Sequence, residues 1–300
     1  MSKAELRKST KTDAGRPKPN IRRFYRRWPW FGILYFLPLL FLNRVITANH
    51  EDTPPQPAEV VFASGKLQLH GFLWKPHGEG PFPSVVWNHG SERRPGMHPS
   101  LAAFYTSHNY VFFEPHRRGH GRSPGEYFED ALAQAPASER GRRRVELHEV
   151  EVEDVVSAVN FLKSQSFVDA QRLAVSGCSF GGIQTLLVGE RSLGIKALIP
   201  FAAAAKSWES NPALQERLKR AVDREKAPVF LLQAENDFNL APTHELTKEA
   251  KRVRADFQSK VYPAVGKTHQ EGHWTFCTEA TNLWGDDVLA FLDAHMKATQ

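Results

Sequence analysis

The chain has 300 residues, a formal net charge of +6 and 41% hydrophobic residues, enough to bury a sizeable core in one large domain or two small ones. The basic charge lies at one end, because residues 1–27 carry ten lysines and arginines against two acidic residues. The remaining chain is close to neutral, so the overall charge is no argument for nucleic-acid binding by the folded part. Two cysteines, Cys178 and Cys277, are too few for a disulfide framework or a cysteine-based metal cluster.

Three segments precede the expected domain. Residues 1–27 are polar, basic and proline-containing, so we expect a disordered tail. The next fifteen residues carry no charge, which is shorter than the roughly 20 apolar residues that span a bilayer. This run predicts a signal peptide cleaved after Ala48 or, taken over 28–46, an anchor with its basic end in the cytoplasm. The alternative is a packed helix of a cytoplasmic protein. Residues 47–57 contain three prolines and indicate a linker.

From residue 58 onward, short β-like runs alternate with helical patterns. The runs at 60–63 and 67–74 predict an antiparallel hairpin at the edge of a sheet. Further strands are expected at 83–88, 110–114, 172–176, 195–201, 228–233 and 257–262. Helices are expected at 98–108, 147–165, 182–188, 207–222, 243–254 and 283–297. This alternation predicts the α/β class, with a mostly parallel sheet covered by helices on both faces. Residues 126–144 look irregular, and with 203–222 they are expected to form a small lid.

The pattern Gly-x-Ser-x-Gly at Gly177–Gly181 lies directly between an expected strand and an expected helix. In that context it predicts a nucleophile elbow, a sharp turn at which glycines allow neighbouring chain to approach closely. Ser179 is then expected to present its hydroxyl above the sheet, with the amide of Phe180 facing an incoming acyl oxygen. The alternative is an ordinary strand-to-helix turn with a capping serine.

An acyl-transferring serine needs a base that takes its proton and an acid that orients this base. Asp237 follows the strand at 228–233, and His273 follows the strand at 257–262. Because the carboxyl ends of parallel strands lie along one edge of a sheet, both side chains are expected to meet Ser179 there. His269 remains an alternative for the base, and Glu235 an alternative for the acid.

From about residue 58 to its end, the chain resembles α/β-hydrolases of the dienelactone-hydrolase and prolyl-oligopeptidase-like branch. The segments that carry the resemblance are Asn88-His89-Gly90-Ser91, Arg118-Gly119-His120-Gly121-Arg122-Ser123, Gly177-Cys178-Ser179-Phe180-Gly181-Gly182, Glu235-Asn236-Asp237 and Glu271-Gly272-His273. The resemblance implies that Ser179 is the nucleophile, Asp237 the triad acid and His273 the general base. It also implies an oxyanion hole made by the backbone amides of Phe180 and Ser91, and chemistry that needs no cofactor.

The chain departs from this family in three places. Dienelactone hydrolases proper use a cysteine nucleophile, whereas here Ser179 is central and Cys178 lies one position earlier. The base is followed by Trp274 instead of a Gly-Phe pair. Residues 1–57 are too few for the N-terminal β-propeller of prolyl oligopeptidases, so an ester is expected as substrate in preference to a peptide.

Other chemistry-bearing residues have structural alternatives. The arginines of the loop at 117–122 are candidates for binding a substrate carboxylate, but more simply they tie the loop to neighbouring carbonyls and acids. His89 and His120 are interpreted as structural hydrogen-bonding groups. Cys178 is interpreted as a buried packing residue, and a disulfide with Cys277 is the alternative in an exported protein. Neither metal-ligand spacing nor a phosphate-binding loop is found in the sequence.

The sequence therefore predicts a serine hydrolase that cleaves a carboxylic ester, or a related acyl bond, of a small molecule through an acyl-enzyme. A small peptidase or amidase is the first alternative, and a non-catalytic, membrane-tethered binding protein is the second. We expect no metal and no nucleic acid, and we expect export or membrane association through residues 28–46. The acyl group, the alcohol group and the oligomeric state have no signal in the sequence.

Overall fold

The computed structural model describes residues 55–253 and 255–297. The predicted tail at 1–27, the predicted signal or anchor at 28–46 and most of the predicted linker lie outside the described residues. Within those two ranges, no helix combines the length and the apolar character needed to cross a membrane.

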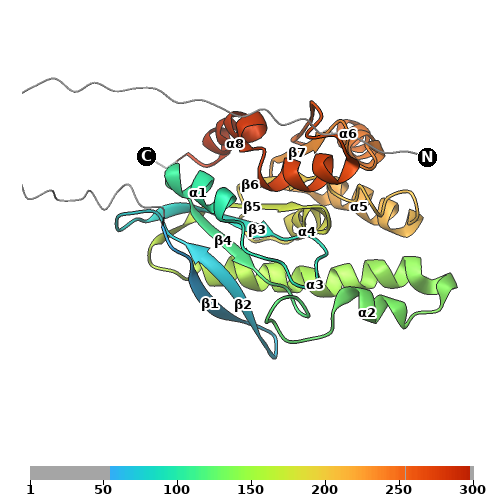
Figure 1. Cartoon of the computed structure of the whole chain (residues 1–300), viewed down its shortest axis with the longest axis horizontal. Helices are drawn as coiled ribbons and strands as arrows, with labels where there is room; N and C mark the ends of the chain where they lie inside the picture. Colours follow the sequence, from blue (N-terminus) through green and yellow to red (C-terminus); the bar gives the residue numbers. More distant parts are fainter. Residues whose placement is uncertain (1–54, 254, 298–300) are drawn as a thin grey trace, which may run out of the picture. The chain divides into compact units, whose positions relative to one another are not determined.

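The strands of the described residues form one sheet in the order β1-β2-β4-β3-β5-β6-β7-β8 (Figure 1). Their bounds are β1 (Ala58–Ser64), β2 (Leu67–Trp74), β3 (Phe82–Asn88), β4 (Val111–Pro115), β5 (Val168–Cys178), β6 (Ala197–Phe201), β7 (Val229–Ala234) and β8 (Phe257–Tyr262). β1 and β2 pair antiparallel, β2 pairs antiparallel with β4, and every other pairing is parallel. The predicted edge hairpin and the mostly parallel sheet are both confirmed.

Helices cover both faces of the sheet, as Figure 1 shows for α8 on one side and α3 on the other. One face packs against α1 (Pro99–Ser107) and α8 (Thr281–His295), and the other against α3 (Arg140–Lys163), α4 (Phe180–Gly189), α5 (Pro212–Arg224) and α6 (Ala241–Val253). The residues of strand β5 show how both faces of the sheet are buried. Leu173 and Val175 point to the α3–α4 side, while Ala174 between them points to the α1–α8 side. A strand buried on both faces reads as a continuous apolar run, which is the pattern that predicted it.

The segment at 126–144 is not irregular as expected. It forms α2 (Phe128–Ala133), a short turn at Ala137–Glu139 and the first turns of α3, which begins at Arg140. Those turns have no apolar periodicity and are joined instead by ion pairs three and four residues apart, for example Arg142 with Glu139 and Glu146. The prediction failed because it relied on apolar spacing, which a helix held by charges does not show.

The chain reverses its direction of travel across the sheet next to β3. It passes from β3 to β4, then returns across β3 to β5, so that β3 and β5 are neighbours. In open α/β sheets the crevice at such a reversal, beyond the carboxyl ends of the strands, is where ligands bind. Two of the segments singled out from the sequence begin there, since His89 follows β3 and Ser179 follows β5.

Candidate active site

Ser179 lies between β5 and α4 in a backbone conformation that non-glycine residues rarely adopt, with φ 58° and ψ −112°. Its backbone N–H donates to the carbonyl of Phe201 at 2.9 Å, and its side chain makes no capping hydrogen bond to α4. The interpretation of Ser179 as a capping serine is therefore wrong. Phe180 is the first residue of α4, so its N–H has no acceptor within the helix and lies at the positive end of the helix dipole.

Glycine is required on both sides of Ser179. A Cβ atom at Gly181 would overlap the carbonyl oxygen of Asn88, and one at Gly177 would come within 2.6 Å of the same atom. The elbow therefore packs directly on the end of β3. This close approach gives the physical reason for the spacing of the Gly-x-Ser-x-Gly pattern.

His273 and Asp237 form a buried acid–base pair. His273 Nδ1 lies 2.7 Å from Asp237 Oδ1, and the two residues are 2% and 4% exposed. Asp237 also accepts hydrogen bonds from the Gln233 side chain at 2.8 Å and from the Phe238 amide at 2.6 Å. A carboxylate only accepts hydrogen bonds, so His273 donates to Asp237 through Nδ1, and the neutral tautomer with that hydrogen carries its lone pair on Nε2. Nε2 is buried and has no hydrogen-bond partner among the described residues, which leaves it available to accept a proton.

Neither alternative forms such a pair. The ring of His269 faces the backbone carbonyl of Asn236, with Nδ1 at 3.0 Å, and the side chain is exposed. Glu235 is exposed as well. The structure thus brings His273 together with Asp237, as the chain order predicted, and leaves the two alternatives outside the pair.

The turn that carries His273 was expected to be a loop but is helical. A widened π-type turn (Glu271–Thr275) runs into the short helix α7 (Phe276–Thr278). Such turns occur often at functional sites. Glu271 fixes the start of this turn by accepting hydrogen bonds from the amides of Lys267 and Thr268 at 2.8 and 2.9 Å.

Arg117 organises the loop that follows β3. It is 1% exposed and donates to Glu151 at 2.8 Å, to the His89 carbonyl at 2.9 Å and to the Gly90 carbonyl at 2.7 Å. Its guanidinium also lies 4.7 Å from the centre of the Phe180 ring. We call Arg117, His89, Gly90 and Glu151 the Arg117 cluster. Through these contacts the cluster holds the loop that follows β3, which includes Ser91, against the start of α4.

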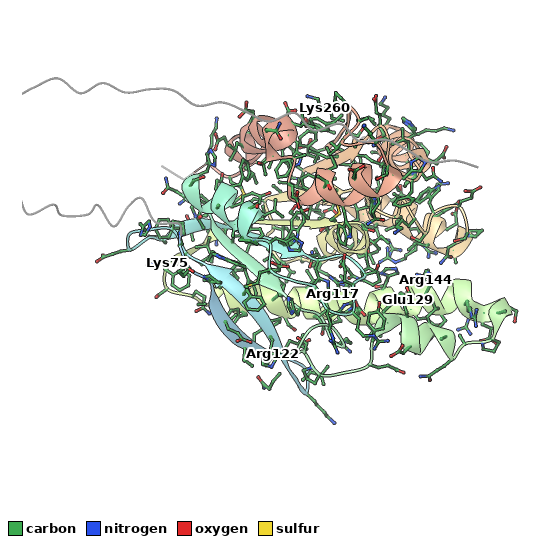
Figure 2. The ribbon with its side chains drawn as sticks, viewed as in Figure 1. Lys75, Arg117, Arg122, Glu129, Arg144 and Lys260 are labelled. Atoms are coloured by element: carbon green, nitrogen blue, oxygen red, sulfur yellow. A yellow bond between two sulfur atoms is a disulfide. The ribbon has the colours of Figure 1, made fainter. Side chains whose placement is uncertain are left out.

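The other arginines of this loop are also occupied. Arg118 forms a two-pronged ion pair with Asp154, at 2.8 Å through Nε and 2.6 Å through Nη2. Arg122 pairs with Glu59 of β1, and Figure 2 shows it on the hairpin side of the molecule, away from Arg117. The contacts favour the interpretation that these arginines tie the loop, and not that they bind a substrate carboxylate.

The histidines around Arg117 are held neutral. Burial and the charge of Arg117 lower the pKa of His116 to about 4 and that of His120 to about 3, and the same two causes lower the pKa of His89 well below its usual value. His120 Nδ1 lies 2.6 Å from the carbonyl of Glu92, and His89 Nδ1 lies 2.9 Å from that of Gly90. Both therefore act as the structural hydrogen-bonding groups that the sequence suggested.

A disulfide joins Cys178 to Cys277, with 5.9 Å between the two Cα atoms and both side chains buried. Cys178 is buried in the core, as interpreted, but the structure shows the less favoured alternative of a disulfide with Cys277. The bond connects the residue before Ser179 to α7, four residues after His273. The two cysteines lie 99 residues apart in sequence, and the sequence suggested the bond only as the alternative for an exported protein.

Two cavities flank these residues. The first, of about 240 Å³, is lined by Ser91, Ser179 and Phe180, and we call it the nucleophile cavity. Its other lining residues are Glu129, Arg144, His148, Ile183, Ala204, Lys206, Ser207 and Ser210. Both segments that were expected to form a lid, 126–144 and 203–222, contribute to it. Arg144, His148 and Lys206 were not singled out from the sequence, because their place at the cavity depends on long-range packing.

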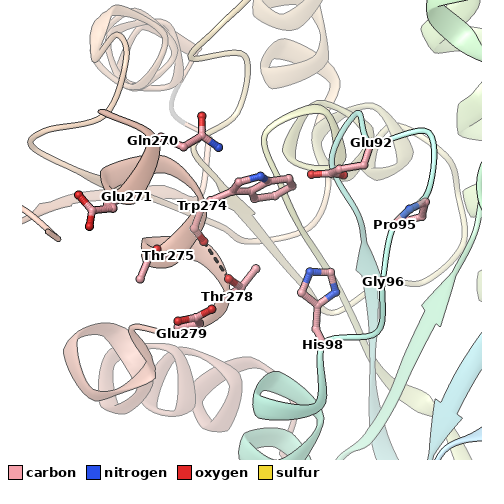
Figure 3. A pocket seen from close by; sticks show the side chains of 10 residues that line it. All are labelled: Glu92, Pro95, Gly96, His98, Gln270, Glu271, Trp274, Thr275, Thr278 and Glu279. Carbon is pink, nitrogen blue, oxygen red and sulfur yellow. Dashed lines mark hydrogen bonds between the residues drawn. The ribbon is translucent and has the colours of Figure 1, made fainter. Parts of the chain in front are cut away.

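The second cavity, of about 440 Å³, lies beyond the neighbours of Ser91 and His273, namely Glu92 and Trp274. Figure 3 shows the carboxylate of Glu92 and the indole of Trp274 pointing toward each other at the border of this cavity. Burial raises the pKa of the Glu92 carboxyl. Glu271 and Glu279 also line this cavity, so its charged side chains are mainly acidic, whereas those of the nucleophile cavity are mainly basic. In the described ranges, no group of three or more histidines, cysteines or acidic residues is arranged to hold a metal ion.

Comparison with known proteins adds one sequence match and several structural ones. Residues 97–200 match the model of the prolyl oligopeptidase family. Among solved structures, an acylaminoacyl peptidase of Pyrococcus horikoshii superposes with a TM-score of 0.62 at 17% identity, over 83% of this chain and 43% of its own. This chain thus spans less than half the length of that peptidase.

Two shorter structures match over nearly their whole length. An esterase of Pyrococcus furiosus has a TM-score of 0.58 at 16% identity, with 81% of this chain and 92% of the esterase covered. A candidate dienelactone hydrolase of Klebsiella pneumoniae has a TM-score of 0.57 at 16% identity, with 80% and 99% covered. At these identities the likeness establishes the fold and leaves the substrate open.

Proposed function

We propose that this chain, a member of the α/β-hydrolase superfamily by its fold and by the match of residues 97–200 to the prolyl oligopeptidase family, is a serine hydrolase that cleaves a carboxylic ester or a related acyl bond. The observation that carries the proposal is the buried pair of His273 and Asp237. The pair follows β8 and β7, and Ser179 follows β5, so all three residues come after the carboxyl ends of parallel strands. Nε2 of His273 has no hydrogen-bond partner among the described residues, Ser179 Oγ included. A serine in a strained turn and a histidine with a fixed tautomer are the two components of an activated nucleophile.

In the proposed reaction, Ser179 Oγ attacks the acyl carbonyl and its proton passes to His273 Nε2. Asp237 stabilises the resulting imidazolium through Nδ1. The N–H groups of Phe180 and Ser91 donate to the oxyanion, and the imidazolium then returns the proton to the leaving alcohol. Water attacks the acyl-enzyme with His273 again as the base, which releases the carboxylic acid and restores Ser179.

Hydrolysis of an ester and hydrolysis of an amide or peptide are the two candidates for the physiological reaction. An ester substrate is supported by the compact esterase and the candidate dienelactone hydrolase, which match this chain over most of their length. A peptide or amide substrate is supported by the family match and by the acylaminoacyl peptidase. A non-catalytic binding role is the least supported alternative, because it gives no reason for the strained conformation of Ser179.

Labelling with a fluorophosphonate probe tests the proposal, since the probe bonds to an activated serine Oγ and releases fluoride. The full-length chain should be labelled, and Ser179→Ala and His273→Ala should abolish labelling. His269→Ala is the matched control and should remain labelled. A folded wild type that stays unlabelled contradicts the proposal. If labelling succeeds, p-nitrophenyl esters and p-nitroanilides of the same acyl groups distinguish esterase from amidase.

We also propose that residues 28–46 export or anchor the protein, although they lie outside the described residues. The buried Cys178–Cys277 bond supports this, because disulfides persist mainly in oxidising compartments. Carbonate extraction of membranes, together with the N-terminal sequence of the mature protein, tests it. A cytosolic protein with an intact first methionine would contradict export.

A further inference from the structure

The polar side chains of the nucleophile cavity are mostly hydrogen-bond donors. Two are cationic, Arg144 and Lys206, and one is a buried histidine, His148. Four serines, the proposed nucleophile Ser179 among them, add hydroxyl groups, and Glu129 is the only acidic residue among the described residues that line the cavity. A cavity with this composition has an excess of positive charge next to the proposed nucleophile.

His148 presents a donor of fixed direction. The side-chain amide of Gln184 donates to His148 Nδ1 at 3.1 Å and to its backbone carbonyl at 3.3 Å. The carbonyl contact fixes which end of the amide faces the histidine, so Nδ1 is an acceptor and the hydrogen is on Nε2. Nε2 has no partner among the described residues, and His148 is 1% exposed. Burial and the charges of Arg144 and Arg117 lower the pKa of His148 well below its usual value, which keeps the ring neutral.

Lys206 presents a cation without a carboxylate partner. No described acidic side chain lies within ion-pair distance of its ammonium, which sits 4.5 Å from the centre of the Phe238 ring. That ring packs edge-on against His273 at 5.4 Å between centres, so Lys206 lies on the side of the proposed base. Two alanines before it, Ala202 and Ala204, have φ values of 50° and 61°, and this unusual backbone sets the course of the loop.

Arg144 is only partly neutralised. It pairs with Glu129 at 3.5 Å, and its guanidinium lies 5.5 Å from the centre of the Phe128 ring. Figure 2 shows Arg144 on α3 beside Glu129 on α2. The acid is 44% exposed, so solvent screens the pair. One screened acid against two cations leaves the cavity positive.

We propose that the nucleophile cavity binds a carboxylate carried by the acyl part of the substrate, so that the enzyme prefers short monoesters or monoamides of dicarboxylic acids. This inference rests on the proposed hydrolase function and names its substrate class. Arg144 and Lys206 supply the charge, and His148 Nε2 supplies a directed hydrogen bond. The volume of about 240 Å³ suits a short chain, because it lies below the roughly 300–1,000 Å³ of common ligand pockets.

Two methyl esters of the same size test the proposal with the full-length enzyme. Monomethyl glutarate carries the carboxylate, and methyl glutaramate carries a neutral amide in its place. Hydrolysis is followed by the release of methanol. We expect kcat/KM to be at least roughly tenfold higher for the acid, as charge-assisted hydrogen bonds allow. Equal values for the two esters would overturn the proposal.

Variants locate the effect in the cavity. Lys206→Met and Arg144→Gln should each lower the acid-to-amide ratio of kcat/KM several-fold, and Lys206→Arg should retain most of it. Lys248→Met, at an exposed lysine on α6, is the matched control and should keep the wild-type ratio. A ratio that falls equally in the Lys248 variant would mean general electrostatic attraction and would overturn the assignment to this cavity.

A binding measurement separates this inference from the proposed function. Calorimetry on the full-length Ser179→Ala variant measures affinity for the two esters without turnover. Tighter binding of the acid that is lost with Lys206→Met supports the site, even if the fluorophosphonate never labels the wild type. Labelling of Ser179 combined with equal binding of the two esters would leave the hydrolase standing and overturn the carboxylate site.

Discussion

Two groups of cations lie close to Ser179, and they differ in how their donors are used. The first group consists of Arg117, which is buried and donates hydrogen bonds to Glu151 and to two carbonyls of the loop after β3. Arg144 and Lys206 line the nucleophile cavity with one partly exposed acid between them. The first group is saturated and holds the structure, whereas the second retains donors for a ligand. The use of the donors, and not the number of charges, separates structural cations from binding cations.

The largest expected effect is on the free energy of unfolding, which a substitution in the first group should lower far more than one in the second group. Arg117→Met leaves Glu151 and two carbonyls buried without their partner, so the free energy of unfolding should fall by about 3–5 kcal/mol. Lys206→Met replaces an exposed side chain and should change the free energy of unfolding by less than about 0.5 kcal/mol. Urea denaturation measures both. Similar losses in the two variants would remove the distinction.

Removing the disulfide tests whether the Arg117 cluster holds the elbow alone. The bond closes a loop of 99 residues, so the double variant Cys178→Ala/Cys277→Ala should lose about 2–4 kcal/mol. The fluorophosphonate labelling rate of the folded double variant reports on the site itself. A slower rate would show that the bond also positions Ser179 and His273. An unchanged rate would assign that task to the Arg117 cluster.

Acid should destabilise the fold through the neutral histidines buried around Arg117. His116 and His120 have folded pKa values of about 4 and about 3, below the usual 6.5, so the unfolded chain takes up their protons first. The stability they contribute is present above pH 6.5 and is lost as the pH falls toward 4. From pH 6 to pH 5 we expect His116 and His120 together to lower the free energy of unfolding by about 2 kcal/mol. His89 and His148, whose pKa values are also lowered, should add to this loss, which urea titrations at each pH measure. A flat profile in this window would contradict neutral burial of the two rings.

The smallest expected effect concerns the acid in the nucleophile cavity. Glu129→Gln removes the partial neutralisation of Arg144, so kcat/KM for monomethyl glutarate should rise about two- to fivefold, in line with a weak surface pair. The value for methyl glutaramate should change less. A decrease for the acid would mean that Glu129 positions Arg144, and the two groups of cations would then be less distinct.

Much of the fold followed from local pattern. The apolar runs of β3, β5 and β7 predicted buried parallel strands, and the ends of β5 and β7 predicted the edge of the sheet at which Ser179 and Asp237 lie. The beginning of α3 did not follow, because its first turns are held by pairs such as Arg142 with Glu146 and carry no apolar stripe. Local pattern is informative where burial alone decides the structure.

The candidate site shows a similar limit. The order of Ser179, Asp237 and His273 was readable because each follows a strand. The contacts of Arg117 agree with the interpretation that it ties the loop to neighbouring carbonyls and acids. Lys206 was not singled out from the sequence, because its place at the nucleophile cavity depends on segments that are distant in sequence. The disulfide between Cys178 and Cys277 was only the less favoured alternative, and the two cysteines lie 99 residues apart in sequence. These properties arise only when the strands bring remote segments together.

The disulfide also changes which parts of the molecule open together. Cys178 ends β5 in the middle of the sheet, whereas the segment with His273 follows β8 at its edge. Edge segments usually open locally at little free-energy cost, and central strands open only on global unfolding. The covalent link ties the mobility of the edge segment to that of the central strand. Amide hydrogens at 271–278 should therefore exchange nearly as slowly as those of β5, and speed up selectively once the link is removed.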